Sequence, residues 1–112
     1  MAKKPEDVLV VMVTAANMEE ATKISQGVVS ARLAACATMI PAVNSMYWWE
    51  GKIVNDQESL IVLKTTQARY AELEKMIQTL HSYKVPEILA LPVSEGVASY
   101  TQWVRGETAR HQ

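Results

Sequence analysis

The sequence predicts an α+β domain in which two helices cover one face of an antiparallel sheet. Three observations carry this prediction. Apolar segments with strand character alternate with amphipathic segments, the order reads strand, helix, strand, strand, helix, strand, and residues 36–65 form one long hairpin with an aromatic tip. The chain has 112 residues, which fits a single domain over 1–112. Residues 1–6 and 109–112 are expected to be frayed termini.

The composition is that of an ordinary globular protein, with 49% hydrophobic and 21% charged residues and a net charge of −1. Because the chain has no basic excess and no nucleic-acid motif, no nucleic-acid partner is expected. The apolar runs are shorter than a membrane span, and the first residues lack the apolar core of a signal peptide. The single cysteine, Cys36, excludes an intrachain disulfide and suits a reducing cytoplasm, which is the expected location.

The first strand and helix follow from an apolar run and a capping pattern. Residues 7–14 are almost continuously apolar and β-branched, which is typical of a strand inside a sheet. Asn17 is a good N-cap and Glu20 stands at the capping-box position of a helix that runs to about Arg32. Gly27 costs roughly 1 kcal/mol in mid-helix relative to alanine, and we interpret it as a close contact with the sheet.

The hairpin is longer than a domain of this size can accommodate. Residues 36–49 span about 46 Å at roughly 3.3 Å per residue, whereas a domain of this length is about 34 Å across. The strand must therefore bend or project, and Pro41, which removes a ladder donor, is the expected bend. Residues 50–51 form the turn, because glycine supplies a positive φ. The return strand, residues 52–65, is expected to be irregular at 55–56.

A second helix, a fourth strand and a short helix complete the chain. Thr66 caps a helix over residues 68–81 whose apolar residues recur at helical spacing: Leu73, Met76, Ile77 and Leu80. A strand over 87–93 follows Pro86, and a helix over 98–108 carries Tyr100, Trp103 and Val104 on one side. This order is the ferredoxin-like βαββαβ sandwich with a long central hairpin and a short C-terminal helix.

Apolar side chains occupy both faces of the hairpin, although the two long helices cover only one face of the sheet. At the tip, strand alternation points Tyr47 and Trp49 to one side and Trp48 to the other. Together these three aromatics can bury on the order of 500 Å2, an upper estimate of about 10 kcal/mol. A patch of that size is typical of an interface, and self-association is the simplest explanation for it.

A series of short segments also matches a known family in order and spacing. They are Arg32-Leu33-Ala34-Ala35-Cys36, Ile40-Pro41, Ser45-Met46-Tyr47, Trp49-Glu50-Gly51-Lys52, Leu63-Lys64-Thr65, Tyr83 with Pro86-Glu87, Leu91-Pro92-Val93, and Tyr100 with Trp103. Over residues 8–105 the chain resembles the CutA divalent-cation tolerance family. The resemblance implies a tight homotrimer similar to the PII signal-transduction proteins, with the hairpin packed against neighbouring subunits. The interface residues are then expected to be Tyr47, Trp48, Trp49 and Trp103.

The resemblance further implies a link to tolerance of copper and other divalent cations. In some family members a cysteine near the end of the first strand and a histidine pair near the end of the second helix have been proposed as copper ligands. Here the strand position is Val13 and the pair reads Leu80-His81, so His81 is kept. Cys36 is a second candidate, as a soft ligand for Cu(I). The alternatives are a buried structural cysteine and a histidine that interacts with the helix dipole.

Lys64 indicates a different kind of site. It follows four apolar residues in a core strand, and lysine is rarely buried unless it is paired. With Glu87 and Tyr83 as neighbours, it forms either a structural ion pair or an intersubunit cleft for a small anionic ligand, as in a PII-like signalling module. Glu50 is a further cleft candidate or only a turn residue. Without a nucleophile–base pair, paired-acid motif, P-loop or dinucleotide fingerprint, no enzymatic activity is expected.

Overall fold

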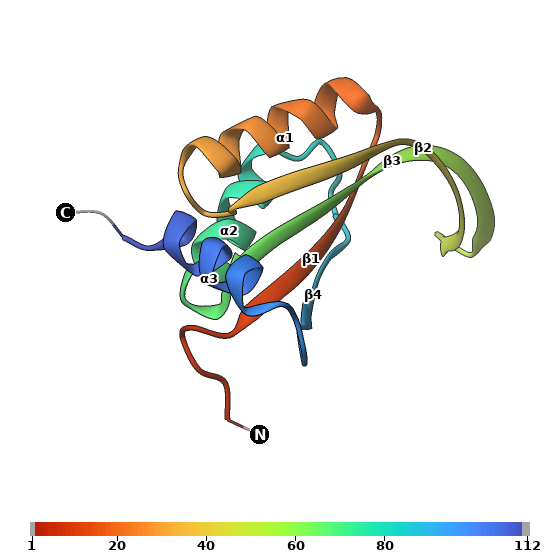
Figure 1. Ribbon diagram of the computed structural model, residues 1–112. Coiled ribbons are helices and arrows are strands. Elements are labelled where there is room, and N and C mark those ends of the chain that lie inside the picture. The colour runs from red at the N-terminus through yellow and green to blue at the C-terminus, as the bar shows by residue number, and fades with distance from the viewer. Residues whose placement is uncertain (1, 111–112) are drawn as a thin grey trace.

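The computed structural model describes residues 2–110 and confirms the ferredoxin-like α+β architecture (Figure 1). The elements in order are β1 (Val8–Ala15), α1 (Met18–Ser30), β2 (Cys36–Trp49), β3 (Lys52–Thr66), α2 (Gln67–Leu80), β4 (Ile88–Pro92) and α3 (Ala98–Thr108). The four strands form one antiparallel sheet in the order β2-β3-β1-β4. Within the described part of the chain, no helix is long and apolar enough to cross a membrane.

The ends of the chain were expected to fray, and the structure describes part of them. The carbonyls of Pro5 and Glu6 accept hydrogen bonds from the Ala68 amide, at 3.0 Å, and from Arg105 Nε, at 2.8 Å. This segment is therefore tied to α2 and α3. Met1, His111 and Gln112 lie outside the described residues.

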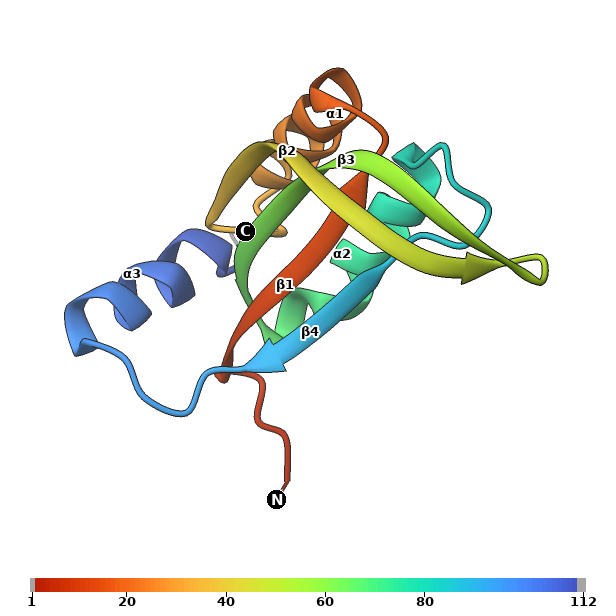
Figure 2. The ribbon, with the colours of Figure 1, turned by 90° about the vertical axis from the view of Figure 1, so that its right-hand side faces the viewer.

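Both long helices pack on one face of the sheet, behind it in the view of Figure 2. The core between these layers consists of apolar side chains from β1, β3, α1 and α2, each at most 4% exposed: Leu9, Val11, Val13, Ile24, Val28, Ile61, Leu63, Leu73 and Ile77. A Cβ atom on Gly27 would lie 2.9 Å from Leu80 Cδ1. The close contact predicted at Gly27 is therefore made with α2 and not with the sheet, because the two helices approach each other there.

Two helix caps depart in part from their predicted pattern. Asn17 Oδ1 accepts from the Glu20 amide at 2.9 Å, as expected of an N-cap. The Glu20 carboxylate, however, accepts from the amides of Ala16 and Ser82 and so links the start of α1 to the loop after α2. Thr66 occupies the N-cap of α2 without a side-chain cap bond, since its hydroxyl faces that of Thr108 at 3.5 Å.

Beyond the sheet, β2 and β3 continue as a curved two-stranded arm, residues 43–58 (Figures 1 and 2). The ladder register shifts between Ile40 and Val43, so Pro41 is the bend as predicted, and Ser59 Oγ donates to the Pro41 carbonyl at 2.7 Å. The prediction of an irregularity at residues 55–56 is wrong, because both residues pair in regular register. The strand bends at the bulge beside Pro41 instead. The arm gives the molecule extents of 44 × 30 × 22 Å.

The sheet face opposite the two long helices is apolar and largely uncovered. Directly opposed residues of antiparallel strands project to the same side. The register therefore assigns to this open face Cys36, Thr38, Ile40, Leu60, Val62, Lys64, Val10, Met12, Leu89 and Leu91. Leu89 and Leu91 are 58% and 50% exposed. Only the end near Cys36 is flanked by α3, where the Tyr100 hydroxyl lies 3.5 Å from Cys36 Sγ.

Candidate functional site

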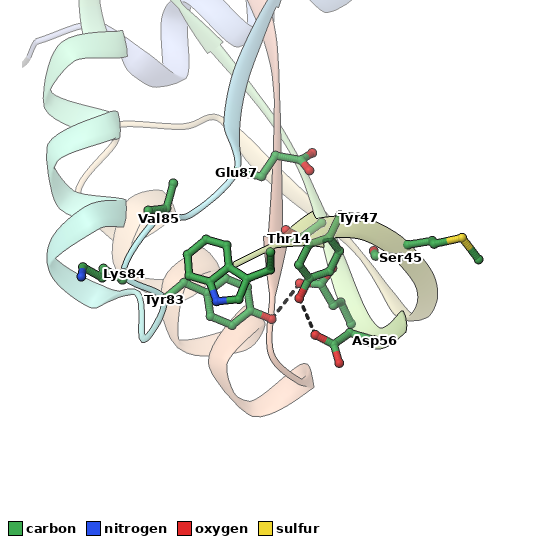
Figure 3. A pocket seen from close by; sticks show the side chains of 11 residues that line it. Thr14, Ser45, Tyr47, Asp56, Tyr83, Lys84, Val85 and Glu87 are labelled. Carbon is green, nitrogen blue, oxygen red and sulfur yellow. Dashed lines mark hydrogen bonds between the residues drawn. The ribbon is translucent and has the colours of Figure 1, made fainter. Parts of the chain in front are cut away.

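A cavity of about 580 Å3 lies between the arm and the loop that follows α2 (Figure 3). We call it the arm pocket. It is lined by Thr14, Ser45, Met46, Tyr47, Trp49, Asp56, Glu58, Tyr83, Lys84, Val85 and Glu87. The ladder pairs Ser45 with Asp56 and Tyr47 with Val54, so alternation brings Ser45, Tyr47 and Asp56 to the same side of the arm.

Two tyrosine hydroxyls hold two of the pocket's carboxylates. The Tyr83 hydroxyl donates to Glu58 Oε2 at 2.7 Å, and the Tyr47 hydroxyl donates to Asp56 Oδ2 at 2.5 Å (Figure 3). Burial and the bond to Glu58 raise the pKa of Tyr83, whereas the bond to Asp56 raises the pKa of Tyr47 to about 12. Both hydroxyls therefore remain protonated donors at neutral pH.

His81 has its side chain buried next to the pocket residues Thr14 and Tyr83. Both of its ring nitrogens are hydrogen-bonded, so neither is available to bind a metal. Its side chain is 0% exposed. Nε2 lies 2.7 Å from the Thr14 carbonyl oxygen, to which it must donate, and Nδ1 accepts from the Tyr83 amide at 3.0 Å. This network assigns the neutral tautomer with the hydrogen on Nε2. The predicted metal ligand is thus a residue that fixes the loop carrying Tyr83.

The two candidate metal ligands lie far apart in one chain. Cys36 pairs with Lys64, which pairs with Val10, whereas His81 contacts Thr14, four residues further along β1. Four residues of strand span roughly 13 Å, well beyond any shared coordination sphere. No group of three or more His, Cys, Asp or Glu residues within 2–110 could hold a metal ion. Cys36 and His81 therefore do not fit a common copper site within one chain.

Of the four residues predicted to form a ligand cleft, only Tyr83 and Glu87 come together. Lys64 lies on the open face, where its ammonium donates to Thr38 Oγ1 at 3.2 Å. Glu87 precedes Ile88, which pairs with Val13 near the other end of β1, so the expected Lys64–Glu87 ion pair is wrong. Glu50 occupies the hairpin turn with φ 50° and does not line the pocket.

Several residues line the pocket without having been predicted as site residues, among them Asp56, Glu58 and Thr14. A usable signal existed for Asp56, because counting back from the two-residue turn pairs it with Ser45. The position of Glu58 in the pocket could not be predicted from the sequence, since it depends on the bulge at Pro41. Its 6% exposure is unusual for a carboxylate and appears only when the loop after α2 is folded over it.

The aromatics assigned to an interface remain exposed in one chain. Trp48 is 71% exposed, Trp49 44%, Tyr47 38% and Trp103 43%. Tyr47 and Trp49 line the arm pocket, and Trp48 does not. The two sides of the hairpin tip therefore differ as strand alternation predicted.

The fold and sequence match known proteins over nearly the whole chain. The family model for "CutA1 divalent ion tolerance protein" matches residues 9–107. A relative from Thermus thermophilus, the divalent-cation tolerance protein CutA, is 42% identical over 99 residues, covering 88% of this chain and 96% of its own length.

Solved structures agree with this match. The structure of the divalent cation tolerance protein Cut A1 from Thermus thermophilus superimposes with a TM-score of 0.89 at 41% identity, covering 91% of this chain and 99% of the other. The CutA1 structure from Oryza sativa gives 0.90 at 35% identity, covering 94% and 96%. The chain belongs to the CutA1 divalent ion tolerance protein family.

Proposed function

We propose that this protein is a cytoplasmic, non-enzymatic homotrimer that supports tolerance of copper and other divalent cations. The similarity to divalent-cation tolerance proteins supports the physiological role. One observation carries the assembly, namely the apolar surface that a single chain leaves exposed on its arm and on the open face.

The exposed apolar side chains on the arm support self-association. On one side of the arm, Trp48 lies opposite Ile53, and the two are 71% and 56% exposed. Met46, two residues from Trp48 on the same side, is 71% exposed. Monomeric proteins rarely expose contiguous apolar patches beyond a few hundred Å2. Because every copy offers both an arm and an open face, a head-to-tail contact that closes into a ring covers both surfaces.

Light scattering coupled to size-exclusion chromatography tests this assembly. We expect three times the 12.5 kDa chain mass for the native protein at micromolar concentration, and a smaller mass for Trp48→Glu. Val29→Glu is the control, since Val29 is 36% exposed on α1, away from both the arm and the open face. A folded native protein with the mass of one chain would contradict the proposal.

Direct metal binding needs a separate test, because Cys36 and His81 do not form a site in one chain. Any site at Cys36 would need donors from a second copy. We therefore expect a saturable site for Cu(I), Cu(II) or Zn(II) in calorimetric titration only with the assembled protein. If none of the three ions saturates, the tolerance role does not depend on direct binding.

A PII-like signalling module is the second candidate function, and the lack of an ion-pair partner for Lys64 favours it. Lys64 is half-buried on an apolar face, and its ammonium forms no ion pair with a carboxylate among the described residues. An anionic ligand at a subunit boundary would neutralise it. We expect Lys64→Met to keep the trimer and to lose binding of inorganic phosphate. Loss of the trimer instead would make Lys64 a structural residue.

A further inference from the structure

We propose that the arm pocket binds a small organic cation, through a primary alkylammonium or guanidinium group. The pocket lies at the Thr14 end of β1, whereas Lys64 pairs with Val10, roughly 13 Å away along the strand. One chain contains all the residues named below.

The charge of the arm pocket favours a cation. Asp56, Glu58 and Glu87 line it, against one ammonium, that of Lys84. In Figure 3 the Lys84 ammonium points away from Tyr47 and Asp56, so it does not neutralise the Asp56 carboxylate. Glu87 makes no hydrogen bond or ion pair with any residue in 2–110. An anion would meet like charge here, whereas a cation would offset it.

Glu58 supplies the strongest single attraction. The residue is only 6% exposed, and its Oε2 accepts from Tyr83. Its Oε1 has no protein donor among the described residues. Oε1 is not among the buried side-chain atoms that lack a partner, so it is open to the water of the pocket and free to accept from a ligand. An N–H donor from a charged group is the partner that would stabilise such a carboxylate most.

The aromatic lining distinguishes an organic cation from a metal ion. Tyr47, Trp49 and Tyr83 line the same cavity as the carboxylates. Cations within about 6 Å of such ring faces are attracted by the ring quadrupole, with alkylammonium and guanidinium groups the usual partners. A hard divalent cation would instead need several oxygen ligands at roughly 2.0–2.6 Å, and no cluster within 2–110 meets that requirement. The volume of about 580 Å3 suits a small organic molecule.

An NMR titration of the 15N-labelled full-length protein with four-carbon probes tests the proposal. We expect n-butylammonium to give saturable shifts at the amides of Tyr47, Asp56, Glu58 and Tyr83. Neutral n-butanol should bind at least about tenfold more weakly, because it lacks the charge-assisted bonds, and butyrate should give no saturable shift. Equal binding of butanol, or tighter binding of butyrate, would overturn the proposal.

Two variants and a control locate the site. Glu87→Gln, at an exposed residue without a partner, should weaken butylammonium binding about fivefold without altering the fold. Glu58→Gln should weaken it about tenfold or more. Glu95→Gln, also exposed but outside the pocket, should bind as the native protein does. Unchanged affinity in both pocket variants would overturn the assignment, as would displacement of butylammonium by equimolar Mg2+ or Cu2+. Light scattering on the same samples separates this result from the assembly.

Discussion

Tyr83 holds the nearly buried Glu58 carboxylate through its hydroxyl, and Tyr83→Phe removes that donor while keeping the ring. We expect a loss of about 1–3 kcal/mol in the free energy of unfolding, because the carboxylate loses its protein partner in a poorly hydrated site. Urea denaturation at pH 7 measures this loss. Tyr47→Phe is the control. Its partner Asp56 is exposed, so water replaces the hydroxyl and the change should be much smaller. Equal losses in the two variants would contradict the burial argument.

The Glu20 carboxylate is expected to make the free energy of unfolding depend on pH in the acid range. Burial alone would raise the pKa of this carboxyl, but hydrogen bonds from Ser82 and Ala16 outweigh it, so the pKa lies below its usual 4.5. A depressed pKa means that the stabilisation is present above pH 4.5 and is lost as the pH falls through the lower folded pKa. Glu20→Gln should therefore be less stable at pH 7 and should converge with the native protein below about pH 3. Denaturant midpoints at pH 7, 5, 4 and 3 measure the difference, and a constant gap would contradict it.

Residue roles were the least predictable part of the molecule. The sequence marks His81, Lys64 and Glu87 as chemically notable, but only tertiary packing decides their partners. His81 reaches the Thr14 carbonyl across 67 residues, and Tyr83 reaches Glu58 across 25. Local spacing carries no information about such contacts. The sequence predicted a cleft near Lys64 that binds an anion, whereas the pocket found in the structure is acidic. This difference follows from contacts of the same long-range kind.

Elements were predicted closely because their signals are local. The strand predicted over 36–49 is β2, the turn at 50–51 has φ values of 50° and 77°, and Pro41 lies at the bulge. Element ends differ by one or two residues. The helix predicted to run to Arg32 ends at Ser30, where Arg32 takes a φ of 59°.

Replacing either of two glycines that lie in open space should change the free energy of unfolding, but in opposite directions. A Cβ on Gly51 or Gly106 would meet no atom within 4 Å, so only backbone preferences decide. Gly51 has φ +77° in the turn, and Gly51→Ala should cost about 1 kcal/mol. Gly106 lies inside α3, and Gly106→Ala should stabilise by about 0.5–1 kcal/mol because alanine favours the helix. Urea denaturation of both variants measures the difference. If both substitutions shift stability in the same direction, the backbone argument fails for this protein.

The shape of the whole molecule could be anticipated from length alone. A strand of about 46 Å does not fit inside a domain about 34 Å across, and the observed long axis of 44 Å is set by the arm. One side of this arm lines the pocket, but the side that carries Trp48, which is 71% exposed, has no partner within the described chain. Geometry therefore connects a sequence feature, the triple aromatic at 47–49, to a proposed property of the assembly.

If folding and assembly are coupled, heat stability must depend on protein concentration. For three chains that unfold together, each tenfold rise in concentration adds about 0.9 kcal/mol per chain, which corresponds to roughly 3–4 °C in the melting midpoint. Because 1 to 100 μM spans two tenfold steps, we expect a shift of roughly 6–8 °C for the native protein across this range by circular dichroism. Trp48→Glu, which places a charge at a 71% exposed position on the arm, should melt lower and with a weaker dependence on concentration. A native midpoint that stays constant across this range would show that the chain folds without its neighbours, and the exposed arm would then need a different partner.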